Sequence, residues 1–180
     1  MASPGNPYIP IGRGRTMPIH MRRSDKEVTD PRELAKPLRE AAYVTLALCR
    51  DNEPYIATLS HGYDEEARRL YFHCAGEGKK VDIIRANPVV WGQALIDGGY
   101  QQGSCDHLYQ TTQFRGVVSF VEGYEEKRRA LETMVRRLDD APDEIIERQL
   151  KPGSVAKVLV ENGHGVEYGQ PLFVPNAGRE

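Results

Sequence analysis

Short stretches of alternating or continuous apolar residues dominate the middle of the chain and predict β-strands. The first three stretches follow one another between residues 43 and 74, separated only by the polar turns 50–54 and 64–66. Connections this short suit antiparallel neighbours, because parallel strands need a crossover of a dozen or more residues. We therefore expect an antiparallel meander with strands at residues 43–49, 55–63 and 70–74.

The second half of the chain adds three more strands and two helices to this picture. The expected strands are residues 89–96, 108–122 and 155–161, with a bulge or bend at Gly116. Apolar residues spaced three and four apart predict helices at 125–138 and 141–150. Six short strands joined mainly as hairpins, with few helices, favour a small closed or split barrel.

Two shorter helices have clear start or stop signals. Asp30 followed by Pro31 fits the N-cap and first position of a helix that runs towards Ala41. A helix over residues 81–86 is expected to stop at Asn87-Pro88.

Composition narrows the class of protein. A length of 180 residues fits one domain, and a net charge of −2 gives no reason to expect nucleic-acid binding. No apolar run reaches the length of a membrane span. The three cysteines are an odd number without CxxC spacing, which fits free thiols in a reducing, cytoplasmic location.

The segment LYFHCAGEGKK, residues 70–80, carries the main chemical signal. A strand ends at His73 and Cys74, a Gly-Glu-Gly turn follows, and Lys79 and Lys80 stand at the start of the next helix. The turn exposes backbone N–H groups, the helix start carries partial positive charge, and the lysines add full charges, so the segment suits a phosphate group. A solvated hairpin turn with surface lysines is the alternative, because neither the P-loop nor the GxGxxG pattern is present.

Four segments in one order carry a resemblance to a known family. They are MRRSDKEVTDPREL (21–34), PYIATLSHGY (54–63), LYFHCAGEGKKVDIIRANP (70–88) and CDHLYQTTQFRG (105–116). Together they resemble the flavin-binding split-barrel superfamily related to pyridoxamine 5′-phosphate oxidase. Within that superfamily they resemble the Nim-type branch associated with nitroimidazole resistance.

This resemblance implies a mainly β fold, a six-stranded Greek-key split β-barrel with flanking helices. It also implies a homodimer with FMN in the groove between protomers. Lys79 and Lys80 would hold the FMN phosphate, and His73 and Cys74 would contact its ribityl or phosphate end. Thr111 would contact the flavin ring, at a position where the family often has Ser. The backbone of one strand would line the isoalloxazine edge, and its residues are Ala57, Thr58, Leu59 and Ser60.

The expected chemistry comes from the cofactor, because the sequence offers no Ser-His-Asp arrangement and no carboxylate pair in an apolar context. The Nim-type resemblance implies an oxidoreductase that reduces a small electrophile such as a nitroaromatic, with electrons from NAD(P)H or another reductant. His73 is the candidate catalytic residue. The alternatives are a non-catalytic flavin- or haem-binding protein, a barrel that binds a deazaflavin, and a pyridoxamine-phosphate-oxidase-like oxidase.

Several polar side chains have competing interpretations. His61 could reach the flavin or a substrate, or lie on the surface, and His73 could be a hydrogen-bonded structural residue. A metal cluster of His73, Cys74, Cys105 and His107 is not expected, because CxH is not an established structural-zinc spacing. Arg22 and Arg23 either hold an anionic substrate or belong to a solvated segment.

The two ends of the chain are expected to lie outside the barrel domain of residues 21–161. Residues 1–20 are rich in Gly and Pro and predict a flexible arm. Residues 152–176 resemble the second half of a biotinyl or lipoyl carrier domain, without the segment that carries the modifiable lysine. The favoured interpretation is that 155–161 is the last barrel strand and 162–180 a hairpin tail. The alternative is completion of the half-domain across a dimer.

Overall fold

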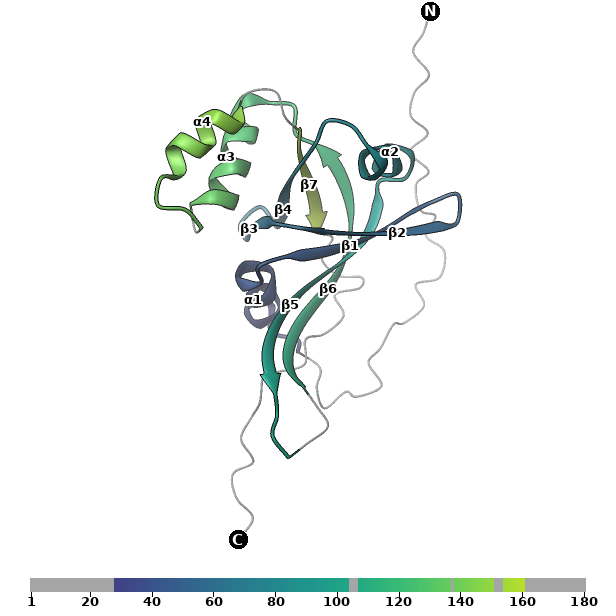
Figure 1. Ribbon diagram of the computed structural model, residues 1–180, viewed down its shortest axis with the longest axis vertical. Helices are drawn as coiled ribbons and strands as arrows, with labels where there is room; N and C mark the ends of the chain where they lie inside the picture. The colour runs from purple at the N-terminus through teal and green to yellow at the C-terminus, as the bar shows by residue number, and fades with distance from the viewer. Residues whose placement is uncertain (1–27, 104–106, 137, 151–153, 161–180) are drawn as a thin grey trace, which may run out of the picture.

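The computed structural model describes residues 28–103, 107–136, 138–150 and 154–160 (Figure 1). Of the expectations above, those for the flexible arm, the carrier-like tail, Arg22, Arg23 and Cys105 lie outside these residues. No helix within the described part is long and apolar enough to cross a membrane. The elements, in chain order, are α1 (Pro31–Glu40), β1 (Val44–Arg50), β2 (Glu53–Leu59), β3 (His61–Asp64), β4 (Arg69–Cys74), α2 (Lys79–Ala86), β5 (Val89–Tyr100), β6 (His107–Phe120), α3 (Tyr124–Val135), α4 (Pro142–Leu150) and β7 (Ser154–Val160).

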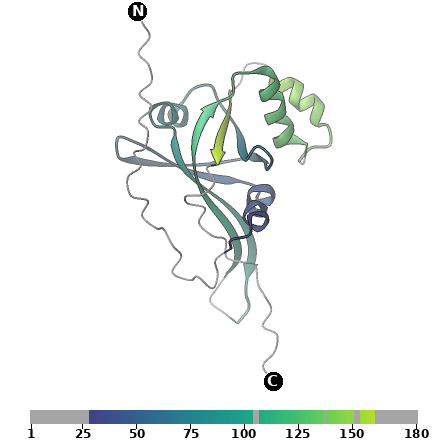
Figure 2. The same ribbon diagram turned by 180° about the vertical axis from the view of Figure 1, so that it is seen from behind.

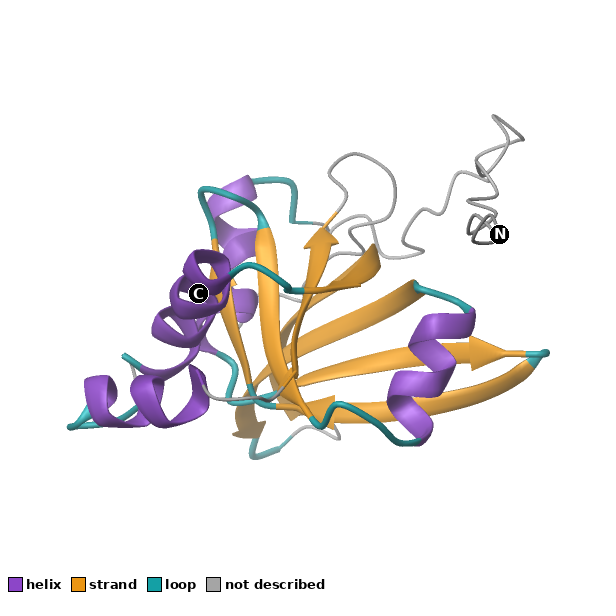
Figure 3. Cartoon of the chain, turned by 90° about the horizontal axis from the view of Figure 1, so that it is seen from above, coloured by secondary structure: helices purple, strands orange, loops and turns teal. Residues whose placement is uncertain are grey.

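The strands form one antiparallel sheet that curls into a half-barrel (Figure 3). Its strand order is β2-β1-β5-β6-β7-β4-β3. The mainly β class is therefore confirmed, but the described chain has seven strands where six were expected.

The extra strand arises at Ser60, where the expected single strand 55–63 is broken. The residues before Ser60 form β2 and pair with β1, whereas those after it form β3 and pair with β4. The two strands lie at opposite edges of the sheet. The predicted meander is therefore wrong at this point, because the chain leaves one edge and joins the other as the sheet curls.

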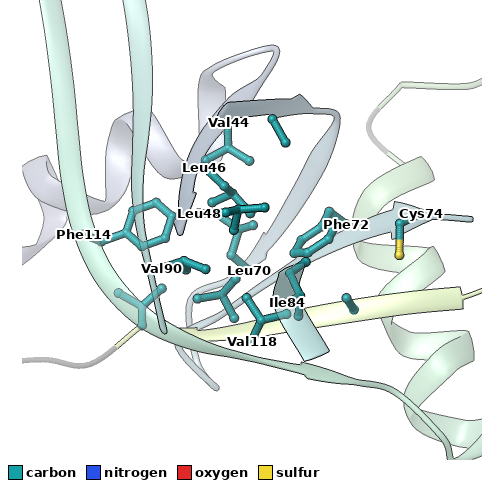
Figure 4. Close-up of a cluster of buried hydrophobic side chains, with 14 of the residues drawn as sticks. Val44, Leu46, Leu48, Leu70, Phe72, Cys74, Ile84, Val90, Phe114 and Val118 are labelled. Carbon is teal, nitrogen blue, oxygen red and sulfur yellow. The ribbon is translucent and has the colours of Figure 1, made fainter. Parts of the chain in front are cut away.

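Alternation along the strands builds the main core. In β1, Val44, Leu46 and Leu48 are buried while the residues between them are more exposed. They meet Phe72 from β4 and Phe114 from β6 inside the half-barrel (Figure 4). Burying one such aliphatic or aromatic side chain contributes about 1.5–3 kcal/mol, so this cluster is the main source of stability.

Helix α1 covers part of the sheet near β5 and β6 and begins as predicted. The Asp30 carboxylate accepts a hydrogen bond from the Arg32 backbone N–H at 2.9 Å, and Pro31 occupies the first turn. The Thr112 hydroxyl donates to the Leu34 carbonyl at 2.7 Å, which fastens the helix to β6.

Helices α3 and α4 lie together on one side of the sheet, away from α2 (Figures 1 and 2). A second core cluster joins them to Tyr71 and Val155. On the α3 side, a Cβ added at Gly62 would lie 2.7 Å from the Thr133 backbone, so only glycine allows β3 to approach the helix this closely. Glu126 ties α3 to the sheet, accepting hydrogen bonds from Arg69 at 2.9 Å and Lys157 at 2.7 Å.

The long β5–β6 pair also depends on glycine. A Cβ at Gly92 would overlap the Phe114 ring, and one at Gly116 would overlap Val158. The β5–β6 register runs unbroken through Gly116, and the register shift lies between Asp97 and Tyr100 instead. Gly116 therefore serves close packing against β7, which the bulge prediction did not anticipate.

Candidate functional site: a cavity between β2 and the start of α2

One cavity of about 430 Å³ lies between an edge of the sheet and the start of α2. Its walls come from β2 and from the turn that links β4 to α2. The lining residues are Tyr55, Ile56, Ala57, Thr58, Leu59, Ala75, Glu77, Gly78, Lys79 and Lys80. Its volume falls within the range of about 300–1,000 Å³ typical of small-molecule sites.

The strand order explains why a cavity forms here. β2 is the edge strand at one end of the sheet. At the other end, β3 pairs with β4 only as far as Phe72, so His73 and Cys74 extend beyond β3. The cavity lies where β2 comes near the turn that follows Cys74.

The β2 wall offers mainly backbone groups. An edge strand pairs on one side only, so alternate N–H and C=O groups point away from its neighbour. Ala57 faces the core, and Ile56 and Thr58 are exposed on the other face of the sheet. The Thr58 hydroxyl lies 3.2 Å from that of Thr45 on β1. The free backbone N–H and C=O groups of this wall can therefore form hydrogen bonds with the polar edge of a planar ring.

The opposite wall is basic. Gly78 caps α2 with a φ of 111°, a conformation that favours glycine, and its carbonyl accepts from the Asp82 N–H at 3.0 Å. No side chain caps this helix start. Lys79 and Lys80 follow immediately and line the cavity. The helix start and both lysines together favour an anionic group such as a phosphate.

Several lining residues are absent from the set predicted from sequence. Glu77 lines the same cavity as the two lysines, and Tyr55 contacts Lys79, whose Nζ lies 4.8 Å from the centroid of the Tyr55 ring. Ile56 and Ala75 complete the walls. These residues flank the predicted ones, so extending each predicted segment by one to three positions would have included them.

The predicted residues divide into two groups in this chain. Five of them line the cavity together, namely Ala57, Thr58, Leu59, Lys79 and Lys80. Four others do not line it, namely Ser60, His73, Cys74 and Thr111. For both groups, contact with a cofactor stays a prediction.

His73 and Cys74 lie on opposite faces of β4, as the alternation predicts. Cys74 is buried among the core residues (Figure 4). Burial raises the pKa of its thiol, and the positive charges of Lys80 and Arg85 offset part of that effect. His73 is itself exposed but lies on the face of β4 that Tyr71 shares and α3 partly covers, and there partial burial, then Lys127 and Lys80, lower its pKa. The raised pKa favours the protonated thiol of Cys74, and the lowered pKa favours the neutral form of His73.

Thr111 lies on β6, three strands from β2 in the sheet order. Its hydroxyl accepts a hydrogen bond from the Gln93 amide at 2.9 Å and donates to the Ala94 carbonyl at 3.0 Å. Its cross-strand partner is Leu95, so Thr111 belongs to the sheet face that also carries Thr45 and Thr58.

His61 is a buried residue, not a surface one. It is 3% exposed, and its Nε2 lies 2.8 Å from the Leu38 carbonyl oxygen. A carbonyl can only accept, so Nε2 carries the proton. His61 is therefore a buried side chain that joins β3 to α1, so the surface interpretation is wrong, and it does not line the cavity. Separately, no group of three or more His, Cys, Asp or Glu suited to a metal ion occurs in the described part of the chain.

Comparison with known proteins found several solved structures with a similar fold. A crystal structure from Bacteroides thetaiotaomicron, a candidate 5-nitroimidazole antibiotic resistance protein, is 23% identical with a TM-score of 0.63, covering 76% of this chain and 82% of its own. An FAD-binding protein from Mesorhizobium loti is 22% identical with a TM-score of 0.54, covering 74% and 90%. An FAD and haem binding protein from Mycobacterium smegmatis is 16% identical with a TM-score of 0.58, covering 85% and 91%.

These likenesses show a shared fold, and the first agrees with the Nim-type resemblance seen in the sequence. A search of curated proteins found no match. The family model described as pyridoxamine 5′-phosphate oxidase matches residues 30–161, which is most of the chain. The protein therefore belongs to the pyridoxamine 5′-phosphate oxidase family.

Proposed function

We propose that this protein binds FMN in the cavity between β2 and α2. The observation that carries the proposal is the meeting of a strand edge and two lysines around one cavity of about 430 Å³. The phosphate would bind at Lys79 and Lys80, and the flavin ring would lie along the backbone of Ala57, Thr58 and Leu59. Ser60, His73 and Cys74 would lie near the bound cofactor, close in sequence to residues that line the cavity.

The fold neighbours support a flavin as the ligand class, because two of the similar structures carry FAD-binding in their names. The single basic end of the cavity favours FMN, which has one phosphate group. The same lysines would attract the phosphorylated tail of a deazaflavin, so identification of the released chromophore is part of the test.

We further propose that the flavin-loaded protein is an oxidoreductase that reduces a small electrophile such as a nitroaromatic. A bound flavin supplies hydride or single-electron transfer, and the protein supplies binding and orientation. The β2 backbone would orient the ring, and neutral His73 is the candidate proton-handling side chain. NAD(P)H or another reductant would bind transiently over the ring.

The proposed assembly is a homodimer that completes the site. The sheet face carrying Thr58 and Thr111 also exposes Ile56 and Leu95, whose exposed fractions are 68% and 44%. Large apolar side chains grouped on one face typically mark an interaction surface. A second copy on this face would bring its own Thr111 towards the cavity of the first.

The test is an absorbance spectrum of the purified protein, identification of any released chromophore, and calorimetric titration with FMN. The Lys79→Ala, Lys80→Ala double variant should bind FMN at least about tenfold more weakly, because each charge-assisted hydrogen bond is worth about 1.5–3 kcal/mol. The matched control is Arg32→Ala, Lys36→Ala on α1, which removes the same charge away from the cavity. Equal affinity in all three proteins would refute the phosphate placement, and a haem Soret band would refute the flavin.

A further inference from the structure

The aromatic ring of Tyr55 and the ammonium group of Lys79 form a contact across the cavity. The Lys79 Nζ lies 4.8 Å from the centroid of the Tyr55 ring, within the reach of a cation–π interaction. Tyr55 comes from β2 and Lys79 from the first position of α2, so the contact connects the two walls. Both residues line the cavity.

The Tyr55 ring is itself held in place. It is half-buried and packs against the main core cluster. Its backbone lies opposite Leu48 of β1, a residue that is only 2% exposed. A ring anchored in this way offers a fixed surface, whereas the Lys79 stem has four rotatable carbons and loses up to about 2 kcal/mol of rotamer entropy when it is ordered.

The chemical nature of the contact suits anion binding. Lys79 takes part in none of the ion pairs found among the described residues. A carboxylate partner would offset its charge and compete with an anionic ligand. An aromatic face carries no net charge, so the ammonium group keeps its full charge and its N–H donors.

We propose that Tyr55 is a positioning residue, which holds the Lys79 ammonium over the cavity for the phosphate group of the ligand. This inference rests on the proposed FMN binding and adds to it a residue that acts through Lys79. It assigns Tyr55 to recognition of the phosphate, not of the flavin ring. The distinction can be measured, because riboflavin has the same ring without the phosphate.

The experiment titrates wild-type protein, Tyr55→Leu and Tyr55→Phe with FMN and with riboflavin. Tyr55→Leu should weaken FMN binding about three- to tenfold, the range expected for a partly solvated cation–π contact, and leave riboflavin binding within about twofold. Tyr55→Phe keeps the aromatic face and should bind both ligands like the wild type. Equal weakening for FMN and riboflavin would overturn the inference, because it would mean that the ring contacts the flavin or only supports the fold.

Two further measurements test the inference, and the second uses only the wild-type protein, so it holds even if Tyr55→Leu folds poorly. In a Lys79→Met background, replacing Tyr55 by Leu should cause no additional loss of FMN affinity, and an additional loss would overturn the inference. In the wild-type protein, NMR should show the Lys79 ε-methylene protons upfield of those of Lys36, because they lie over a ring. Random-coil shifts would overturn it. Wild-type protein that binds neither FMN nor riboflavin would overturn the proposed function itself, and this inference with it.

Discussion

At the scale of single residues, Glu77 opposes the charge of the lysines with which it shares the cavity. Glu77, Lys79 and Lys80 all line it, so a bound phosphate would meet one negative and two positive side chains. Like charges in a partly enclosed site repel more strongly than in bulk water. Such a carboxylate limits affinity for an anion and favours its release.

Replacing Glu77 by Gln should therefore raise FMN affinity about two- to tenfold, as expected for removal of one nearby like charge at partial solvent exposure. Riboflavin affinity should not change, because riboflavin lacks the phosphate. Titration calorimetry at low and high salt measures both effects, and the gain should shrink at high salt. The matched control is Glu53→Gln at the exposed start of β2, outside the cavity lining. Unchanged FMN affinity in the Glu77→Gln protein would show that Glu77 does not belong to the binding site.

A second residue-scale prediction concerns the pH dependence of stability. Partial burial, followed by the charges of Lys127 and Lys80, lowers the pKa of His73 in the folded protein. The unfolded chain then takes up this proton more readily than the folded one. The stability tied to neutral His73 is present above the ordinary pKa of about 6.5 and is lost as the pH falls from there through the lowered pKa of the folded protein.

His73→Gln should therefore reduce the loss of stability between about pH 7.5 and pH 5, while the difference from wild type stays constant above about pH 8. Urea unfolding at several pH values measures this slope. Parallel curves for the two proteins across the acidic range would contradict the environment found for His73.

The sequence predicted part of the cavity lining, but not all of it. Lys79 and Lys80 could be recognised because a glycine turn and a helix start have local signatures. The roles of Tyr55 and Glu77 depend on β2 meeting the β4–α2 turn, a contact between segments about twenty residues apart in sequence. His61 could not be assigned for the same reason, since its partner Leu38 belongs to a different element.

At the scale of elements, the pairing of β5 with β6 depends on a glycine that faces an aromatic ring. Gly92 and Phe114 are direct cross-strand partners, and a Cβ at position 92 would overlap the ring. Phe114 is fully buried, so its ring has little freedom to move aside.

Gly92→Ala should lower the free energy of unfolding by about 1–3 kcal/mol, the usual cost of overpacking. Phe114→Leu alone should also destabilise the protein, through lost contacts and a cavity. The double variant should be more stable than the sum of the single effects by about 0.5 kcal/mol or more, because the smaller side chain leaves room for the new methyl. Chemical denaturation of all four proteins completes the cycle. If the two changes in unfolding free energy were strictly additive, the side chains at positions 92 and 114 would not be in steric contact.

The helices and strands could be predicted from local sequence patterns, whereas the connection between β2 and β3 could not. The predicted helices and all six predicted strand regions occur in the described chain. The break at Ser60 was missed because residues 55–63 read locally as one strand. Only the curling of the sheet, which sends β2 and β3 to opposite edges, shows that they are two.

At the scale of the whole molecule, the proposed dimer depends on the sheet face that carries Thr111. Leu95 lies directly across from Thr111 and is 44% exposed on that face. A charge placed there would be desolvated and would face an apolar surface if a second copy covered it, at a cost of several kcal/mol in the assembled state. In a lone protomer the same charge would stay hydrated.

Leu95→Glu should therefore shift the protein from dimer to monomer and weaken FMN binding, while changing the thermal stability of the protomer little. Leu138→Glu is the matched control, because Leu138 is 64% exposed and follows α3, which packs against β3 and β4 at the other end of the sheet order from β1 and β2. Analytical ultracentrifugation with and without FMN measures the molecular mass and shows whether FMN promotes dimerisation. A ligand that binds only the dimer must shift the equilibrium towards the dimer. A Leu95→Glu protein that remains dimeric would place the interface elsewhere. A monomer that binds FMN as tightly as wild type would show that one chain supplies the complete site.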